Sequence, residues 1–400
     1  MIKPLKPGAA PIIKATIPAL EAHGVTITKT MYEKLMQDPA IAAMFNQTDQ
    51  ATGRQPRALA AAVLAYAKHI DDPSALENTL GLIVEKHVAL SVTPEQYPVV
   101  GEALLTAIGT VLGEAATPEI IDAWAEAYRF LADVLISRET ALTHTRETEP
   151  GGWRGWRSFR VAKRVQESPD MVSFWLEPVD GKPVLKHVPG QYLALALEQD
   201  GLNTRRCYSI SSAPSTHAYR ISVKRDPHGM VSSWLHANLH ENGILEVAPP
   251  AGQFTLEASG SAPVLLVSGG SGITPFMSML PEQEEKNPGR PMHLVHTTPS
   301  LDHMPFLAEL ASLQKTEAAP EIDLFSTKDE NAHPDTSLRV HEGHVSAEWL
   351  AEQLGNEGHL YFCGPRGFQR DLFSALTKLG IPESRLHHEF YGPDESLLAA

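Results

Sequence analysis

Cysteine and positive charge are both scarce in this 400-residue sequence. Its two cysteines, Cys207 and Cys363, can form neither a disulfide framework nor a four-cysteine iron–sulfur site. There are 33 Lys and Arg against 48 Asp and Glu, which gives a formal net charge of −15. Binding to a nucleic-acid backbone requires clustered basic residues, so this balance argues against a nucleic-acid partner.

Long apolar runs are absent as well. No stretch of about 18 consecutive apolar residues occurs, so we expect no transmembrane segment. Residues 1–20 carry scattered prolines instead of the unbroken apolar core of a signal peptide. These absences predict a cytoplasmic protein, and we expect a monomer that acts on small molecules.

Three segments with different patterns follow one another along the chain. Residues 1–147 have apolar side chains at helical spacing, which predicts an all-α domain. Residues 152–260 contain short strands rich in Val, Tyr, Phe and Leu, which predict a small antiparallel β-barrel. Residues 261–400 alternate apolar strands with helices, which is typical of a doubly wound α/β domain.

One helical face in the first segment is apolar except for a single histidine. Its members recur at spacings of four and three: Leu76, Leu80, Ile83, His87 and Leu90. Such a face suits a haem, because iron binds a neutral imidazole nitrogen and aliphatic side chains bury the porphyrin. A core histidine bonded to a backbone carbonyl is the alternative, and the pattern alone leaves both open.

Two kinds of turn signal help to place the elements. Thr93–Gln96 and Thr117–Glu119 are typical helix starts, with Thr as N-cap and Pro in the first turn. A glycine-rich turn, Ser268–Pro275, follows the buried strand Val264–Val267, and Thr274 is expected to cap the next helix. Backbone N–H groups in such a turn can approach a pyrophosphate, although a tight turn without a ligand has the same pattern.

Three motifs in the second and third segments resemble those of the ferredoxin–NADP reductase superfamily. They are Arg205-Arg206-Cys207-Tyr208-Ser209, Gly229-Met230-Val231-Ser232 and Tyr361-Phe362-Cys363-Gly364-Pro365. The resemblance implies that Arg206 holds the FAD pyrophosphate, Tyr208 packs on the flavin and Ser209 approaches its reactive edge. The other residues assigned to FAD or nicotinamide binding are Tyr192, Cys207, Gly229, Val231, Ser232, Gly270, Ser271, Gly272, Ile273, Thr274, Pro275, Cys363, Gly364 and Pro365.

Residues 12–140 are similar to the globin of flavohaemoglobins, and with the reductase motifs the resemblance covers essentially the whole chain. Lys86-His87-Val88-Ala89-Leu90 and Pro94-Glu95-Gln96-Tyr97 are similar to the proximal haem segment of that family. The resemblance implies that His87 ligates the iron, while Tyr97 and Glu139 form a hydrogen-bonded group behind it. On the opposite side of the haem, Tyr32, Phe45, Gln55 and Leu59 match the distal positions.

The C-terminal segment His388–Pro393 resembles the tail that covers the flavin in this family. The residues assigned to it are Phe390, Tyr391, Gly392 and Pro393. The family usually has Phe where Tyr391 stands, so this chain adds a hydroxyl. Lys86 and Glu389 match a pair that the family places between flavin and haem, where they could tune both redox potentials.

The resemblance implies a nitric oxide dioxygenase that binds haem b and FAD and converts NO and O₂ to nitrate with NAD(P)H. Two alternatives stay open: reduction of peroxides or lipid hydroperoxides, and a haem-based binder or sensor of O₂ or NO. A lipid bound in the distal pocket is also compatible with the resemblance. The choice between NADH and NADPH stays open, because the Thr297–His303 loop has no clear basic cluster.

Overall fold

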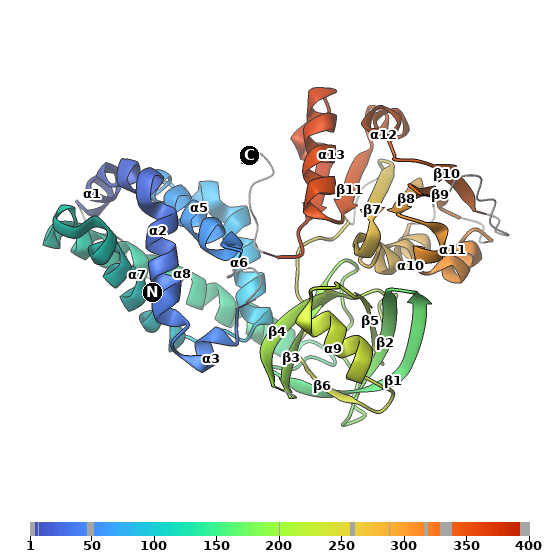
Figure 1. Cartoon of the computed structure of the whole chain (residues 1–400), viewed down its shortest axis with the longest axis horizontal. Helices are drawn as coiled ribbons and strands as arrows, with labels where there is room; N and C mark the ends of the chain where they lie inside the picture. Colours follow the sequence, from blue (N-terminus) through green and yellow to red (C-terminus); the bar gives the residue numbers. More distant parts are fainter. Residues whose placement is uncertain are drawn as a thin grey trace.

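The computed structural model describes residues 5–6, 8–45, 52–199, 201–256, 261–287, 289–315, 319–328 and 338–392. Figure 1 shows three units in chain order: a helical unit at one end, an antiparallel barrel beneath the centre, and a parallel sheet flanked by helices. The predicted fold class, an all-α domain followed by a β-barrel and an α/β domain, is confirmed.

The helical unit packs its helices around two apolar clusters. The helices are α1 (Ala9–Ala15), α2 (Ile17–Leu35), α3 (Pro39–Ala42), α5 (Arg54–Lys68), α6 (Glu77–Ala89), α7 (Gln96–Leu112) and α8 (Pro118–Thr148). The larger cluster contains buried residues such as Ile27, Met31 and Ile108, and the smaller one contains Leu80 and Val84 of α6. A short 3₁₀ turn, Pro73–Leu76, leads into α6. Because α6 ends at Ala89, His87 lies near the C-terminal end of its helix.

The two predicted helix starts in this unit differ in outcome. The start at Thr117 is confirmed, with Thr117 as N-cap and Pro118 as the first residue of α8. The start at Thr93 is wrong by two residues, because α7 begins at Gln96 with Glu95 as its N-cap. The Gln96 carboxamide still accepts the Thr93 N–H at 2.9 Å, which orders the turn that precedes the helix.

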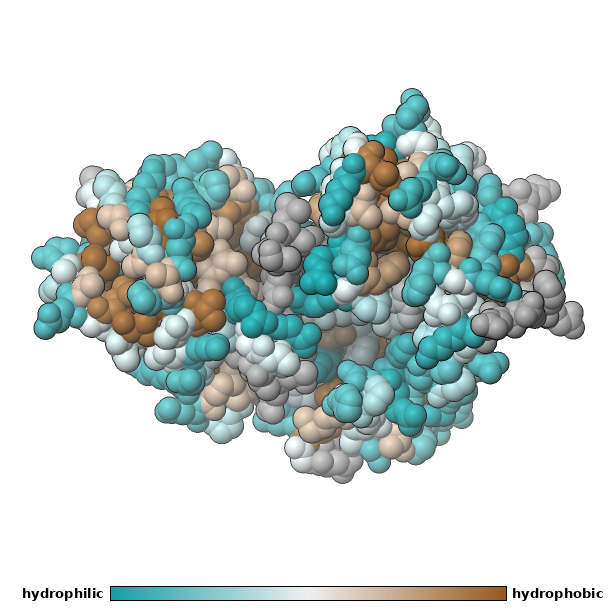
Figure 2. All heavy atoms as spheres, turned by 45° about the horizontal axis from the view of Figure 1, so that its top comes forward, coloured by the Kyte–Doolittle hydropathy of each residue, from teal (hydrophilic) through white to brown (hydrophobic). Residues whose placement is uncertain are grey.

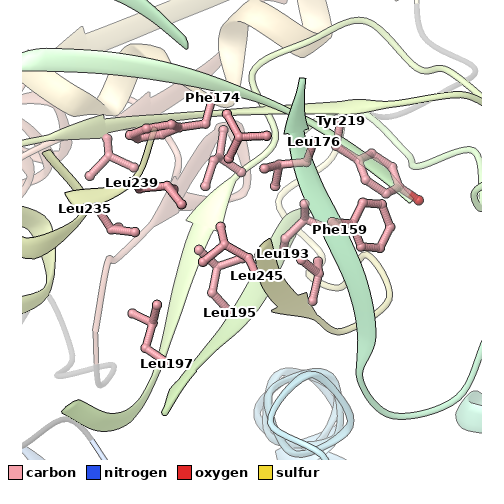
Figure 3. Close-up of a cluster of buried hydrophobic side chains, with 14 of the residues drawn as sticks. Phe159, Phe174, Leu176, Leu193, Leu195, Leu197, Tyr219, Leu235, Leu239 and Leu245 are labelled. Carbon is pink, nitrogen blue, oxygen red and sulfur yellow. The ribbon is translucent and has the colours of Figure 1, made fainter. Parts of the chain in front are cut away.

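The second unit is a sheet of six strands that curls into a barrel. Its order is β4 (Leu202–Ser209), β3 (Tyr192–Gln199), β6 (Ile244–Val247), β1 (Arg157–Ser168), β2 (Met171–Pro178) and β5 (Tyr219–Lys224), all antiparallel. A bridge between Ile210 and Ile221 joins the chain beyond β4 to β5. Figure 3 shows Phe159, Leu193 and Tyr219 among the side chains that fill the interior, and helix α9 (Met230–Asn238) adds Leu235.

The third unit is a parallel sheet between layers of helices. Its order is β10 (Arg339–Glu342), β9 (Glu321–Ser326), β8 (Met292–Thr298), β7 (Val264–Gly269), β11 (His359–Cys363) and β12 (Leu386–Glu389). The helices are α10 (Phe276–Lys286), α11 (Leu307–Leu313), α12 (Ala347–Leu354) and α13 (Arg366–Lys378). Strand β7 is buried along its whole length, as its unbroken apolar sequence predicts.

One segment bears on the expectation that no helix spans a membrane. Residues 96–115 form a helical stretch long and apolar enough to cross one by length and composition alone, with 28% of the window buried. Tyr97, Leu104 and Ile108 of this stretch are buried inside the helical unit, as core residues of a globular domain would be.

Figure 2 shows that the helical unit and the α/β unit are separated by a notch at the upper edge.

Candidate functional site

His87 is held by two side chains from other helices. Its Nδ1 lies 2.8 Å from Oε1 of Glu139 on α8 and 2.9 Å from the hydroxyl of Tyr97 on α7. The Tyr97 hydroxyl also donates to the same carboxylate oxygen at 2.5 Å. Burial and this hydrogen bond raise the pKa of Tyr97 well above its ordinary value, so the phenol keeps its proton. The Glu139 carboxylate therefore accepts hydrogen bonds from both the Tyr97 hydroxyl and His87 Nδ1.

This arrangement fits a haem iron. With Nδ1 donating to the carboxylate, the lone pair of the neutral imidazole is on Nε2. Nε2 makes no hydrogen bond to any described residue. A carboxylate behind a ligating imidazole fixes its orientation and increases its basicity. These features distinguish His87 from a core histidine bonded to a carbonyl, the alternative that the sequence left open.

The four residues expected on the distal side come from two helices and the turn after α3. Tyr32 on α2 is buried, and its ring meets Phe45 edge to face with centroids 5.3 Å apart. Leu59 on α5 packs against the same apolar core, and Gln55 is half-buried in the first turn of α5. The Thr28 hydroxyl donates to the Pro56 carbonyl at 2.8 Å, which fixes the start of α5 against α2.

The arginine–tyrosine–serine motif lies on β4 and ends at the edge of the barrel. The Arg206 guanidinium donates to the Thr204 hydroxyl at 2.5 Å and to the Arg205 carbonyl at 2.8 Å. Tyr208 packs against the barrel core, and burial raises the pKa of its phenol. A guanidinium, which stays charged, and a buried aromatic ring fit the diphosphate and the ring system of a flavin.

The Gly229–Ser232 turn begins helix α9. Gly229 is the N-cap, and a Cβ built there would lie 2.6 Å from the Ser232 hydroxyl oxygen. That oxygen accepts the Asp226 N–H at 3.1 Å, and Val231 is buried in the barrel core. The free N–H groups in the first turn of a helix attract anionic groups, which agrees with the expected role of this turn.

The glycine turn after β7 and the Cys363-Gly364-Pro365 turn after β11 lie against each other. A Cβ at Gly272 would lie 2.0 Å from the Cys363 carbonyl oxygen, so only glycine fits there. Gly270 has a φ of 53°, which glycine adopts without strain. Both turns follow neighbouring parallel strands at the carboxyl edge of the sheet, the usual position for a dinucleotide.

The expectation that Thr274 caps the following helix is wrong. The turn first forms a short 3₁₀ helix, Gly270–Ile273, and α10 begins at Phe276. The Thr274 hydroxyl donates to the Ser271 carbonyl at 2.9 Å, and the Pro275 carbonyl accepts the Met279 N–H in the first turn of α10. It also lies 3.0 Å from the Tyr391 hydroxyl.

The C-terminal segment brings Tyr391 between the barrel and the α/β unit. Its hydroxyl lies 3.3 Å from the Ser209 hydroxyl oxygen and 3.3 Å from the Ser271 carbonyl oxygen. Phe390 lies beneath the Arg366 guanidinium, 5.1 Å from the ring centroid, and the Gly392 N–H donates to the Phe390 carbonyl. Pro393, also expected here, lies outside the described residues.

Lys86 and Glu389 lie where the three units meet. The Lys86 ammonium lies 3.4 Å from the Cys207 sulfur and 5.3 Å from the centroid of the Tyr192 ring. Burial raises the pKa of Glu389 to about 8 although the charge of Lys86 acts in the opposite direction. One oxygen of Glu389 is buried and has no hydrogen-bond partner among the described residues, which fits a site that a cofactor completes.

Sequence reasoning missed two residues in this region, Glu85 and Arg146. They form a buried ion pair between α6 and α8, and Glu85 also accepts the Gly252 N–H of the barrel. The sequence signal that could have pointed to Glu85 is the row Gly81, Glu85 and Ala89, which recur at a spacing of four. It marks a second face of α6, turned away from His87.

The fold and these sites define a globin-type unit joined to a flavin- and nicotinamide-type reductase. Family models match the three units in order: a globin over residues 28–135, an oxidoreductase FAD-binding domain over 158–256 and an oxidoreductase NAD-binding domain over 266–373. The chain belongs to the flavohemoprotein family, as the resemblance predicted.

Curated relatives and solved structures agree with this assignment. Flavohemoproteins of Pseudomonas putida and Deinococcus radiodurans are 43% and 44% identical, over 96% and 98% of this chain and 98% of each relative. A flavohemoglobin of Malassezia yamatoensis, solved with bound FAD and haem, has a TM-score of 0.86 at 27% identity and covers 98% of this chain and 100% of its own. The FAD/NAD-binding domain of a Vibrio cholerae nitric oxide dioxygenase matches 60% of this chain and 100% of its own, at 31% identity and a TM-score of 0.53.

Proposed function

We propose that the protein is an NAD(P)H-dependent nitric oxide dioxygenase that converts NO and O₂ to nitrate. The observation that carries this proposal is the presence, in one chain, of the His87–Tyr97–Glu139 group and a reductase site that meets the same helix, α6. The nitric oxide dioxygenase of Vibrio cholerae, whose reductase domain this chain resembles, supports the same activity.

We propose haem b, FAD and NAD(P)H as the cofactors. When bound, these groups supply hydride acceptance, single-electron transfer and the binding of dioxygen. His87 would hold the iron, with Tyr97 and Glu139 keeping its imidazole electron-rich. Tyr32 and Gln55 would donate hydrogen bonds to a ligand on the opposite side, while Phe45 and Leu59 exclude water there.

The reductase residues divide by cofactor. Arg206 and the first turn of α9 would hold the FAD diphosphate, with Tyr208 and Ser209 at the ring system. The turn Gly270–Pro275 and the turn Cys363–Pro365 would receive the nicotinamide nucleotide. Tyr192, Cys207 and the tail residues Phe390–Pro393 would complete the flavin site, and Lys86 and Glu389 would set the charge between the two redox centres.

We propose three domains: 1–147 for haem, 152–260 for FAD and 261–400 for NAD(P)H. This division is supported by the last helix of the first unit, which ends at Thr148, and by the parallel sheet, whose first strand begins at Val264. We also propose that the protein is a cytoplasmic monomer.

Consumption of NO by the purified, cofactor-loaded protein tests the activity. With O₂ and NADH or NADPH present, we expect rapid loss of NO and formation of nitrate in equal amounts. Omission of O₂ or of both nucleotides should stop it. NO loss that is unaffected by these omissions would contradict the proposal. Rapid turnover of a lipid hydroperoxide without turnover of NO would favour the peroxidase alternative instead.

A further inference from the structure

Helix α6 has two opposite faces with different partners. His87 points toward Tyr97 and Glu139, whereas Glu85, two residues earlier, points to the barrel. Residues two positions apart on a helix are about 200° apart around its axis, so these side chains lie on opposite sides. A change in how the Glu85 face sits on the barrel must therefore move His87 relative to the barrel.

Glu85 joins α6 both to α8 and to the barrel. Its Oε2 accepts the backbone N–H of Gly252 at 2.8 Å and the guanidinium of Arg146 at 2.5 Å. Both side chains of the ion pair are about nine-tenths buried, with 11% and 8% of their surface exposed. One carboxylate oxygen thus connects α6, α8 and the barrel, and charged groups strengthen hydrogen bonds of this kind.

The rest of this face consists of small residues. Ala89, one turn after Glu85, packs against Ala194, Ala248 and Ala251 of the barrel unit. Gly81, one turn before it, lies so close to Gln253 that an added Cβ would be 2.9 Å from the amide nitrogen. Small side chains allow close approach, but they interlock little and so fix the rotation of a helix poorly. The directional contacts of Glu85 add that restraint, beside the contact of Lys86 with Cys207 and the hydrogen bond from Arg205 to the Leu90 carbonyl.

Packing beyond the end of α6 also leaves room for movement. A cavity of about 290 Å³ lies between the α6–α7 corner, helix α8 and the segment that leads into the barrel. Glu139 and Arg146, seven residues apart on α8, both line it. The Glu85–Arg146 pair lies beside this cavity, and at the corner itself the Arg205 guanidinium of the barrel donates to the Leu90 carbonyl.

We propose that Glu85, held by Arg146, positions α6 on the barrel and thereby sets the rate of electron transfer from flavin to haem. Each transfer oxidises the flavin by one electron and reduces ferric iron to ferrous, and no bond forms or breaks. The role is one of positioning, because the hydrogen-bond partners of Glu85 are Arg146 and Gly252, and neither residue is assigned to a cofactor. The inference rests on the proposed function, in which the haem receives electrons from the flavin.

Glu77 offers a matched control on the same two helices. It pairs with Arg138 of α8 through two contacts, at 2.7 and 2.9 Å, and both side chains are exposed. Glu77→Gln therefore removes an α6–α8 ion pair without touching the barrel. Glu85→Ala removes both contacts of Glu85, while Glu85→Gln can keep the bond to Gly252 and loses only the charge.

The experiment mixes full-length holoprotein with NADH without air and follows flavin bleaching and haem reduction separately. For Glu85→Ala we expect flavin bleaching at the wild-type rate and haem reduction slower by roughly several-fold, because the rate of electron transfer falls steeply as the distance between donor and acceptor grows. Glu85→Gln should be slowed less, and Glu77→Gln should match wild type. The haem absorbance spectrum should be unchanged in all three variants.

Two results would overturn the inference: wild-type haem reduction in both Glu85 variants, or equal slowing by Glu77→Gln. If Glu85→Ala does not fold, the comparison of Glu85→Gln with Glu77→Gln decides, and equal rates overturn the inference. A general loss of stability would slow flavin bleaching as well, which separates a structural role from a positioning one. If the haem of the wild-type protein is not reduced at all, the proposed function itself fails.

Discussion

The globin half and the reductase half build their sites in different ways. In the reductase, the site residues come in short runs at the ends of strands, such as Arg206–Ser209 and Gly270–Pro275. In the globin, they are single side chains on separate helices: Tyr32 on α2, His87 on α6 and Glu139 on α8. A run at a strand end can be found from local sequence, whereas side chains on separate helices meet only in the folded chain.

This difference also affects how each half responds to mutation. The nucleotide turns rely on backbone groups and on glycines that leave room for them, so few side chains there are indispensable. The iron site depends on one imidazole and on two groups behind it. We therefore expect the largest single-residue effect in the globin half.

His87→Ala should have the largest effect. Removal of the only proposed protein ligand to the iron should abolish NO consumption and strongly lower haem content. NAD(P)H-dependent reduction of a dye should persist, because the reductase site lies in other units. The absorbance spectrum and the two assays measure this, with His144→Ala on the exposed side of α8 as the control. Loss of both activities would show that the two halves do not function separately.

Arg206→Ala should have the reciprocal effect. A hydrogen-bonded charge contributes roughly 1.5–3 kcal/mol, so FAD affinity should fall by about tenfold to a hundredfold. Haem content should stay at the wild-type level. Flavin fluorescence after dialysis measures the retained FAD, and Arg160→Ala on the barrel surface serves as the control. Full retention of FAD would contradict the assignment of Arg206.

Asp323→Asn should lower the stability of the α/β unit without touching either redox site. Burial opposes ionisation of Asp323, but hydrogen bonds from His293 and His341 and the charge of Arg339 outweigh it, and the pKa is lowered to about 2. The ionised carboxylate therefore stabilises the fold above its ordinary pKa of 3.8, and this contribution is lost as the pH falls from 3.8 toward 2.

At neutral pH we expect Asp323→Asn to reduce the free energy of unfolding by about 1–3 kcal/mol. The difference from wild type should shrink below pH 3.8, where the wild-type carboxylate begins to take up its proton. Denaturant titrations at several pH values measure both effects. A difference that does not change with pH would mean that charge on Asp323 is not the cause.

Tyr391→Phe should have the smallest effect. It restores the residue usual in the family and removes hydroxyl contacts to Ser209, Ser271 and Thr274. Partly exposed hydrogen bonds of this kind contribute about 0.5–1.5 kcal/mol, so dye reduction should change by less than about tenfold. Steady-state rates at varied NADH measure this. A loss as large as that of Arg206→Ala would mean that the hydroxyl itself is needed for the reaction.

The sequence predicted the three units and their order well, because each has its own periodicity. Strand β7 shows this, since four consecutive apolar residues predict a strand buried on both faces. Helix ends were less predictable. The Thr93 and Thr274 starts fail because these residues belong to turns that precede the helix: the Thr93 N–H donates to the Gln96 side chain, and the Thr274 hydroxyl donates to the Ser271 carbonyl. Local spacing cannot distinguish a turn residue of this kind from a helix cap.

The site was only partly predictable from residue patterns. His87 stands out as a polar residue on an apolar face, but Glu139 meets it from 52 residues away, and only the family resemblance pointed to the pair. Glu85 and Arg146 were missed because a charged pair on helices usually indicates a solvated surface. What buries them is the barrel, which no pattern within the globin segment describes.

The proposed activity requires that electrons pass from the flavin of this chain to its haem iron. Addition of NADH to the purified holoprotein without air, followed by absorbance, tests it most directly. We predict that the flavin band bleaches and that the haem bands then shift to those of ferrous iron. A flavin that bleaches while the haem stays ferric would contradict the account.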